Sequence, residues 1–334
     1  MTAAARICAF CVALLAAGAA AQAGPPAKDA FSHRPEVRAF IRDIAERHAF
    51  IEQELRLLFA RARRMESVLK AITPPKDPRE RSWHAYRERF VNQARIGEGL
   101  EFWRRHQGAL ARAAAAHGVP EEIIVAIIGV ETLYGRNAGS FRVIDALSTL
   151  AFLYPPRAEY FRSELEQYLL FARDAGVDVF SVKGSYAGAI GIPQFMPSSY
   201  RRFAVDFDGD GAIDLRGSTV DAVGSVANFL REHGWRRGEP VQLPAHVAGE
   251  AHRPMLEAGI EPRFTLASLR AHGVETRSSL PVETVVALID LATPGAPTEY
   301  RLGMRNFYVL TRYNRSSFYA AAVHDLALEL RQRR

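Results

Sequence analysis

Cysteine is almost absent from this 334-residue chain, and its two cysteines, Cys8 and Cys11, both lie near the N-terminus. Arg6 precedes an apolar stretch there, and an Ala-Gln-Ala sequence with the small residues of a cleavage site closes it. We therefore expect residues 1–23 to be a secretory signal peptide and the mature chain to be a soluble periplasmic protein. Neither cysteine stands at the end of this segment, where a lipid-bearing cysteine would be. The mature core is expected to hold without disulfides.

Long hydrophobic runs and a strong charge of one sign are lacking as well. No later segment approaches the roughly 20 apolar residues of a membrane-spanning helix, so no transmembrane anchor is expected. Loss of Arg6 leaves 42 of the 43 basic residues against 37 acidic ones, a net charge of +5. This mild, dispersed excess suits an anionic polymer such as cell-wall glycan and is weaker than the basic stripe of a nucleic-acid binder. The histidines show no ligand spacing, which disfavours a zinc site.

Helical periodicity dominates the chain up to residue 235. Apolar residues recur at helical spacing over residues 35–70, over residues 144–174 with a break at Tyr154-Pro155-Pro156, and from Val220 to His233. Gly118 to Glu122 has a proline and two acidic residues where a helix would begin. These patterns predict a mainly α fold with a helical domain over residues 24–235.

The residue pattern changes from helical to β-prone after Trp235. Short β-prone segments punctuated by proline and glycine occupy 241–244, 282–291 and 299–304, so we expect a small α+β subdomain over residues 236–305. The stretch from Phe307 to Leu310 fits a helix or a strand. The periodicity from Ser317 to Leu330 is helical, and residues 306–334 are expected to return to the helical domain.

One carboxylate stands out within an aliphatic stretch. Glu131 follows Ile127 and Ile128 at spacings of four and three, so the three share one helix face. Desolvation on such a face raises the pKa of a carboxyl, as a general acid requires. Alternatively, the glutamate turns outward or pairs with Arg136. Glycines 129 and 135, with Tyr134 close by, suggest that something approaches the backbone closely.

A second segment, from Gly184 to Tyr200, combines small residues, hydroxyls, aromatic rings and the amide of Gln194. It lacks the lysine of a phosphate-binding loop and the spacing of a nucleophile elbow, which makes Ser185 a poor nucleophile. Its composition suits a sugar groove, through close backbone approach, hydrogen bonds and stacking faces. Close helix packing through small residues is the alternative.

Together, GVETLYGR and GSYAGAIGIPQFMPSSY, in this order and spacing, resemble the membrane-bound lytic transglycosylase B family of cell-wall enzymes. The resemblance covers nearly all of residues 35–327. It extends through further motifs at Asp145-Ala146-Leu147, Tyr154-Pro155, Arg157 to Tyr160, Gly224 to Asn228, Asn306 to Tyr308 and Thr311 to Asn314.

The resemblance implies a lysozyme-like helical fold and non-hydrolytic cleavage of the MurNAc-β-1,4-GlcNAc bond of peptidoglycan. It assigns Glu131 as the lone acid and then base, with the substrate's N-acetyl group in place of a second carboxylate. No catalytic cofactor is implied. By the same resemblance, the groove residues are Tyr86, Tyr160, Ser185, Gln194, Phe229, Tyr313, Asn314 and Tyr319. Phe229 stands where relatives have tyrosine, which removes one hydroxyl but keeps a stacking face.

The segment from Asp206 to Leu215 matches the first nine positions of an EF-hand loop. Acids occupy positions 1, 3, 5 and 9, glycine occupies position 6, and Ala212 offers its carbonyl at position 7. Position 12 is Gly217, so Asp221 is the nearest substitute for the closing ligand. We expect a structural Ca²⁺ site with the ligands Asp206, Asp208, Asp210, Ala212 and Asp221. An acidic surface loop without metal is the alternative.

Three functions thus remain in competition. A lytic transglycosylase would leave 1,6-anhydroMurNAc ends on peptidoglycan glycan strands. A muramidase would complete the same cleavage with water and leave reducing ends. A non-catalytic glycan-binding protein of the cell wall is disfavoured by the intact motif around Glu131. The expected partners are glycan strands and other cell-wall enzymes, with no nucleic acid.

Overall fold

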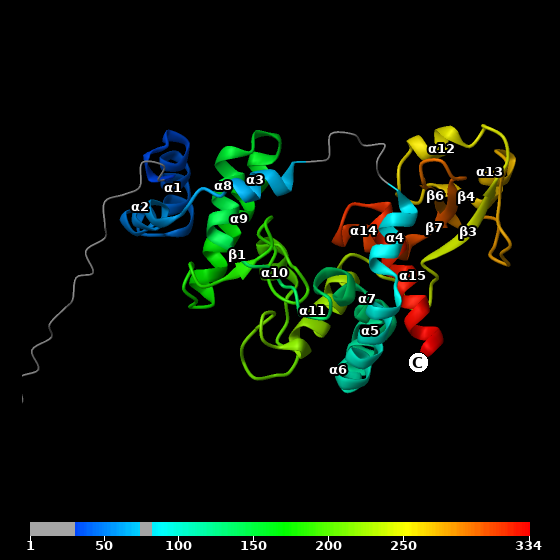
Figure 1. The fold of residues 1–334 in the computed structure, drawn as a ribbon, viewed down its shortest axis with the longest axis horizontal. Coiled ribbons are helices and arrows are strands. Elements are labelled where there is room, and N and C mark those ends of the chain that lie inside the picture. Colours follow the sequence, from blue (N-terminus) through cyan, green and yellow to red (C-terminus); the bar gives the residue numbers. More distant parts are fainter. Residues whose placement is uncertain (1–30, 74–81) are drawn as a thin grey trace, which may run out of the picture.

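The computed structural model describes residues 31–73 and 82–334, and the predicted signal peptide lies outside these ranges. Most described residues up to Trp235 are helical or lie in the loops between helices (Figure 1). The first group of helices is α1 (Pro35–His48), α2 (Glu52–Arg61), α3 (Glu66–Ile72), α4 (Trp83–Phe90), α5 (Gln93–Arg105), α6 (Gln107–His117) and α7 (Glu121–Thr132). The second group is α8 (Val143–Leu153), α9 (Ala158–Asp174), α10 (Pro197–Phe203) and α11 (Thr219–Glu232).

Helix α7 is the central helix of this body. Its residues from Ile123 to Val130 are all buried, and Glu121 and Glu122 stabilise its N-terminus against the helix dipole. It packs against α5, α6, α11 and the last helix of the chain. Within the described ranges no single helix is long and apolar enough to cross a membrane. Helices α6 and α7 reach that length only together, and they bend by 115° at their junction.

A five-stranded antiparallel sheet follows Trp235. Its strand order is β4-β6-β7-β3-β5. The strands and their helices are β3 (Gln242–Val247), α12 (Arg253–Glu257), β4 (Phe264–Thr265), α13 (Leu266–Ala271), β5 (Val274–Glu275), β6 (Val285–Leu291) and β7 (Glu299–Gly303). Strand β6 is apolar on both faces because Val286 and Leu288 enter a small core with α12 and α13, whereas Ala287 and Ile289 join the main core.

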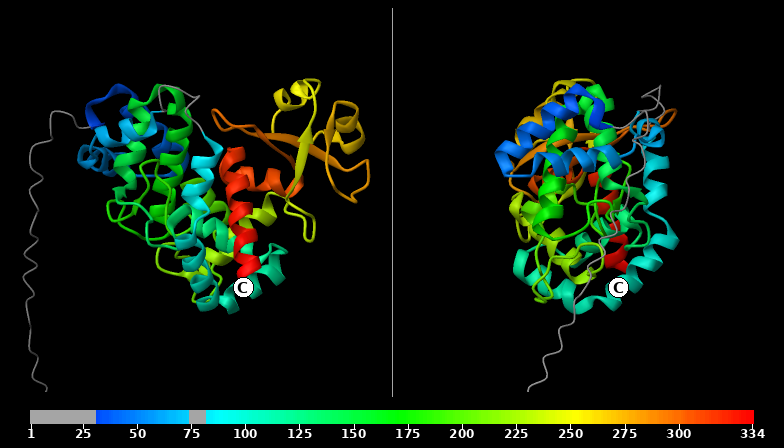
Figure 2. Two further views of the ribbon diagram at one scale, coloured as in Figure 1. Left: turned by 45° about the vertical axis from the view of Figure 1, so that its right-hand side comes forward. Right: turned by 90° about the vertical axis from the view of Figure 1, so that its left-hand side faces the viewer.

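The last two helices return to the helical body. Helix α14 (Arg305–Tyr313) resolves the open assignment of Phe307 to Leu310 in favour of a helix, and α15 (Ser317–Arg333) is the predicted final helix. Figures 1 and 2 show α15, in red, between the helical body and the sheet. It packs against α4, α5, α7 and β6. The two parts of the chain therefore meet along α15.

The mainly helical prediction is confirmed, with one refinement. The periodic stretch over residues 35–70 is three helices because Ala49 adopts a left-handed conformation (φ 55°) and Ala62 an extended one (ψ 142°). Helical periodicity continues across both breaks, and nothing in residue type marks either alanine as a helix end. The break predicted at Tyr154 is present, where a 3₁₀ turn over Pro155–Arg157 separates α8 from α9.

Candidate functional site

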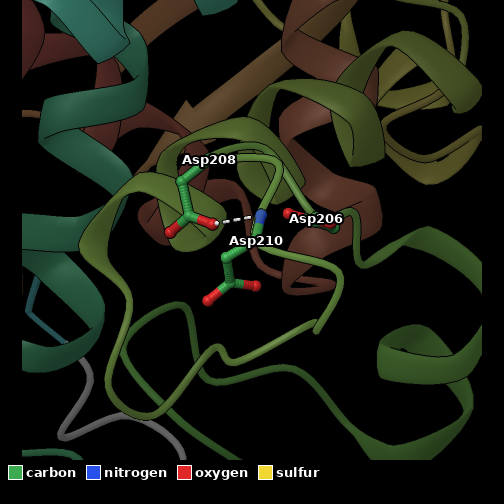
Figure 3. Close-up of side chains that lie close together, drawn as sticks. All are labelled: Asp206, Asp208 and Asp210. Carbon is green, nitrogen blue, oxygen red and sulfur yellow. Dashed lines mark hydrogen bonds between the residues drawn. The ribbon is translucent and has the colours of Figure 1, made fainter.

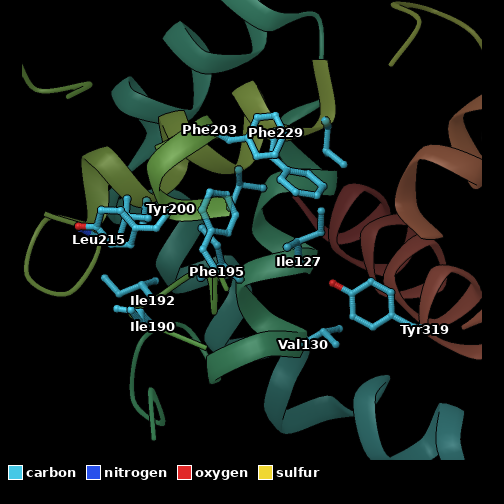
Figure 4. Close-up of a cluster of buried hydrophobic side chains, with 14 of the residues drawn as sticks. Ile127, Val130, Ile190, Ile192, Phe195, Tyr200, Phe203, Leu215, Phe229 and Tyr319 are labelled. Carbon is cyan, nitrogen blue, oxygen red and sulfur yellow. The ribbon is translucent and has the colours of Figure 1, made fainter. Parts of the chain in front are cut away.

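Glu131 lies in the last turn of α7 and is partly buried. The hydroxyl of Tyr319 on α15 donates a hydrogen bond to Glu131 Oε1 at 2.6 Å. Burial raises the pKa of Glu131 to about 7, and the bond from Tyr319 acts in the opposite direction. In Figure 4, the Tyr319 hydroxyl is directed at α7 near Ile127 and Val130. The glutamate is thus a carboxyl that both holds and releases a proton near neutral pH.

Three tyrosines from different helices surround this carboxyl. Tyr86 comes from α4, Tyr313 from α14 and Tyr319 from α15, and the charge of Glu131 raises the pKa of each phenol, after burial as the larger cause. The rings of Tyr313 and Tyr319 are stacked, with centroids 6.3 Å apart. Tyr313 donates its hydroxyl to the carbonyl of Pro193 at 2.5 Å. The sequence-predicted residues Tyr86, Tyr313 and Tyr319 therefore converge on Glu131.

The alternative pairing of Glu131 with Arg136 is not present, because Arg136 donates to Glu98 at 2.7 Å. The close approach suggested by the glycines is made by the protein itself. A Cβ on Gly129 would lie 2.6 Å from the Tyr134 hydroxyl, so the ring of Tyr134 occupies this space. Gly135 has φ +89° in the left-handed turn that follows α7.

The two sequence motifs are joined by a side-chain hydrogen bond and by close backbone packing. Thr132 donates its hydroxyl to the carbonyl of Ile192 at 2.8 Å, which links the end of α7 to the second motif. Gly139 has φ +95°, and a Cβ there would lie 2.1 Å from the carbonyl oxygen of Gly184. The small residues of the second motif thus serve its close packing next to Glu131.

Gln194 and Ser185 stabilise the loop that bears them. Gln194 adopts a left-handed conformation (φ 52°), and its amide nitrogen donates to the carbonyls of Ala138 and Gly191 at 3.0 and 2.9 Å. The Ser185 hydroxyl accepts from the backbone N–H of Ala189 at 3.0 Å. Two of these bonds lie within the loop, and the bond to Ala138 ties the loop to the segment that follows α7.

A groove of about 730 Å³ lies beside the stacked tyrosines, a size that suits a small ligand. Five of the predicted groove residues line it: Tyr160, Gln194, Phe229, Tyr313 and Asn314. Phe229 is buried. Its ring packs on Phe203 and Phe195 (Figure 4) and on Tyr313, so its stacking face is turned into the core.

Several groove residues were not foreseen from the sequence. Arg157, Arg312 and Arg315 bring three cations to the groove, and Arg312 and Arg315 directly flank the predicted Tyr313-Asn314 pair. Glu164 is buried and accepts from the Ser198 N–H and hydroxyl at 2.9 and 2.7 Å. Burial is the main cause that raises its pKa. The three arginines lie in or beside the family motifs, and this position could have identified them in the sequence. Arginines dispersed along a chain are, however, typical of a solvated surface.

The acidic loop brings three carboxylates together (Figure 3). Oxygens of Asp206, Asp208 and Asp210 lie within 4.8 Å of one another. Gly209 and Gly211, at φ +79° and +91°, direct their N–H groups to Asp206 at 2.7 and 2.9 Å. These hard oxygen donors fit a Ca²⁺ ion.

Asp221 is placed differently from these three. It is 1% exposed, and its carboxylate accepts from the N–H groups of Phe207, Asp208 and Asp214. The Asp221 carboxylate therefore fixes the backbone of the loop through hydrogen bonds. It is not one of the three clustered carboxylates. Phe207 packs against Gly224, where a Cβ would lie 2.3 Å from the ring, so the loop is seated on α11.

Comparisons with known proteins agree with one another. Residues 32–328 match the family described as Transglycosylase SLT domain. The membrane-bound lytic murein transglycosylase B of Escherichia coli K12 is 43% identical over 305 residues, which cover 89% of this chain and 82% of that protein. Among solved structures, the catenated lytic transglycosylase SltB1 from Pseudomonas aeruginosa is 46% identical, with a TM-score of 0.85, covering 91% of this chain and 99% of the other.

The Escherichia coli lytic transglycosylase Slt35 in complex with calcium is 42% identical, with a TM-score of 0.81, covering 90% of this chain and 94% of the other. The expected lysozyme-like helical fold with a small sheet is therefore confirmed, and the relatives are lytic transglycosylases, as the sequence predicted. The chain belongs to the Transglycosylase SLT domain family and is a lytic murein transglycosylase, which cleaves peptidoglycan glycan strands with formation of 1,6-anhydroMurNAc ends.

Proposed function

We propose that Glu131 is the single catalytic acid and base of this transglycosylase. The observation that carries the proposal is its carboxyl, held by Tyr319 at 2.6 Å and given a pKa of about 7 by burial. An acid that must first donate and then accept a proton works best when its pKa lies near the working pH. No second carboxylate among residues 31–73 and 82–334 is among the groups that perturb the pKa of Glu131.

In the first step, protonated Glu131 transfers its proton to the glycosidic oxygen as the bond between C1 of MurNAc and that oxygen breaks. The N-acetyl oxygen of MurNAc stabilises the positive charge that develops at C1. In the second step, the C6 oxygen of MurNAc bonds to C1 and its proton passes to the Glu131 carboxylate. The 1,6-anhydro ring is closed, and Glu131 is protonated for the next cycle.

The groove residues supply binding. Aromatic faces and hydroxyls stack on sugar rings and bond to their substituents, and Arg157, Arg312 and Arg315 attract the carboxylates of peptidoglycan. The proposed binding residues are Tyr86, Tyr160, Ser185, Gln194, Phe229, Tyr313, Asn314 and Tyr319. The interior position of Phe229 supports an indirect role, in which it backs the ring of Tyr313 at 4.8 Å.

Calcium is proposed as a structural ion. Asp206, Asp208 and Asp210 would hold it, with the carbonyl of Ala212, while Asp221 orders the loop through three backbone N–H groups. The ion would offset the mutual repulsion of the three carboxylates. The calcium complex of Slt35 supports this proposal. No catalytic cofactor is needed.

We further propose that residues 1–23 direct the chain to the periplasm, where the mature enzyme is soluble and meets peptidoglycan and other cell-wall enzymes. Both cysteines lie inside this segment and not at its end, which supports release without a lipid anchor. Residues 24–235 and 306–334 are proposed as the catalytic domain, and residues 236–305 as the sheet subdomain.

Muropeptide analysis tests the catalytic proposal. Purified sacculi digested with the wild-type enzyme should yield anhydro-ended muropeptides by mass spectrometry, and Glu131→Gln should yield none. Glu257→Gln, at an exposed glutamate of α12, is the matched control and should retain the products. Full activity of Glu131→Gln would reject the assignment.

A further inference from the structure

A buried ion cluster joins the sheet to the two helices that carry Tyr86 and Tyr319. Arg301 of β7 is 9% exposed and Asp325 of α15 is 7% exposed. Arg301 donates from Nη1 and Nη2 to the two carboxylate oxygens of Asp325 at 2.6 and 3.0 Å. Arg87 of α4 donates its Nε to Asp325 at 2.7 Å. One aspartate therefore connects β7, α15 and α4.

Helix α4 is attached to the sheet at further points. Trp83 is fully buried, its indole N–H donates to Glu299 of β7 at 2.9 Å, and its backbone N–H donates to the carbonyl of Ala292 at 2.9 Å. Glu299 also accepts from Arg301 at 2.6 Å. Arg87 and Arg301 are thus paired with Asp325 and Glu299. The first residue of α4, Trp83, is bonded to the sheet and to the residue that follows β6.

The same helices carry the neighbours of Glu131. Tyr86 precedes Arg87 on α4, and Tyr319 lies on α15 with Asp325. The ring of Phe318, next to Tyr319, contacts both Trp83 and Tyr86, with centroids 5.5 and 5.7 Å apart. A shift of α4 against α15 would therefore change the surroundings of Glu131 directly.

Stability alone does not account for this cluster. Desolvation of a buried ion pair costs about as much as the attraction returns, and apolar side chains would hold the same interface at least as well. What a bidentate arginine–carboxylate pair adds is direction, because its two parallel hydrogen bonds are satisfied in one geometry. The cluster therefore fixes the orientation of α4 and α15 relative to β7.

We propose that Arg301, Asp325 and Arg87 are positioning residues for the transglycosylase reaction, through which the sheet sets the placement of α4 and α15, and with it the contact between Tyr319 and Glu131. The proposal rests on the assignment of Glu131 as the catalytic residue. It gives the sheet subdomain a part in catalysis although none of its side chains lies at the carboxyl.

The test compares kcat, KM and pH profiles on solubilised glycan strands. Arg301→Met should lower kcat by about 10- to 100-fold, the scale of small misplacements, while KM stays within about twofold. The alkaline limb of the kcat profile should move to higher pH, because a weaker bond from Tyr319 no longer lowers the pKa of Glu131. Arg263→Gln, in an exposed pair with Glu261 of the same subdomain, is the matched control and should match wild type.

A double-mutant cycle separates positioning from general structural damage. The double variant Arg301→Met/Tyr319→Phe should lose little more activity than Tyr319→Phe alone. Both changes act on the same contact, the hydrogen bond from Tyr319 to Glu131. Additive losses, or an unchanged pH profile in the folded Arg301→Met variant, would overturn the proposal.

If Arg301→Met does not fold, Arg87→Gln replaces it in the same double-mutant cycle. The Arg87 side chain is 39% exposed and its loss leaves the Arg301–Asp325 pair intact, so this variant is expected to fold. Failure of the catalytic assignment itself is recognised separately, by activity in Glu131→Gln.

Discussion

The stability of Glu131→Gln relative to wild type should depend on pH. Burial raises the pKa of Glu131 from 4.5 to about 7, so the folded protein holds this proton more tightly than the unfolded chain does. Wild type therefore loses stability as the pH rises from 4.5 to about 7. Above pH 7 the loss amounts to about 3 kcal/mol. Glutamine does not ionise, and the variant escapes this loss.

Urea unfolding followed by circular dichroism measures the effect. At pH 8 the variant's advantage over wild type should exceed that at pH 5 by about 2.5 kcal/mol. Other groups with raised pKa values, such as Glu164, are present in both proteins and cancel in the difference. Calcium must be held constant because an ion that binds the folded protein also changes its stability. A variant-to-wild-type difference that stays the same at every pH would refute the reasoning.

Three further outcomes are expected. Tyr319→Phe removes the bond that lowers the pKa of Glu131, so the alkaline limb of the kcat profile should move to higher pH; a limb that stays in place in a rate assay would contradict this role. Gly139→Ala should destabilise the protein by about 2 kcal/mol or more in urea unfolding, since its Cβ would meet the Gly184 carbonyl in a left-handed backbone. Calcium at about 100 times its Kd should stabilise the protein by about 2.7 kcal/mol, and Asp206→Asn should abolish most of that gain in calorimetry.

The sequence alone predicted most of the secondary structure and singled out Glu131 as the candidate catalytic carboxyl. Helical periodicity, proline breaks and the acidic start of α7 are local signals, so the start of α7 and the bounds of α11 and α15 were predicted close to those observed. The aliphatic surroundings of Glu131 already indicated a raised pKa. The family resemblance named five of the residues that line the groove.

Only the tertiary structure decided which groups act on that carboxyl. Tyr319 is 188 residues away from Glu131, and Arg87 is 238 residues away from Asp325. Periodicity describes one helix at a time, and it does not say which faces meet when helices from both ends of the chain pack together. The same reason explains why Phe229 is interior, why Asp221 bonds to backbone N–H groups instead of joining the clustered carboxylates, and why the sheet reaches Tyr86 and Tyr319 through buried ion pairs.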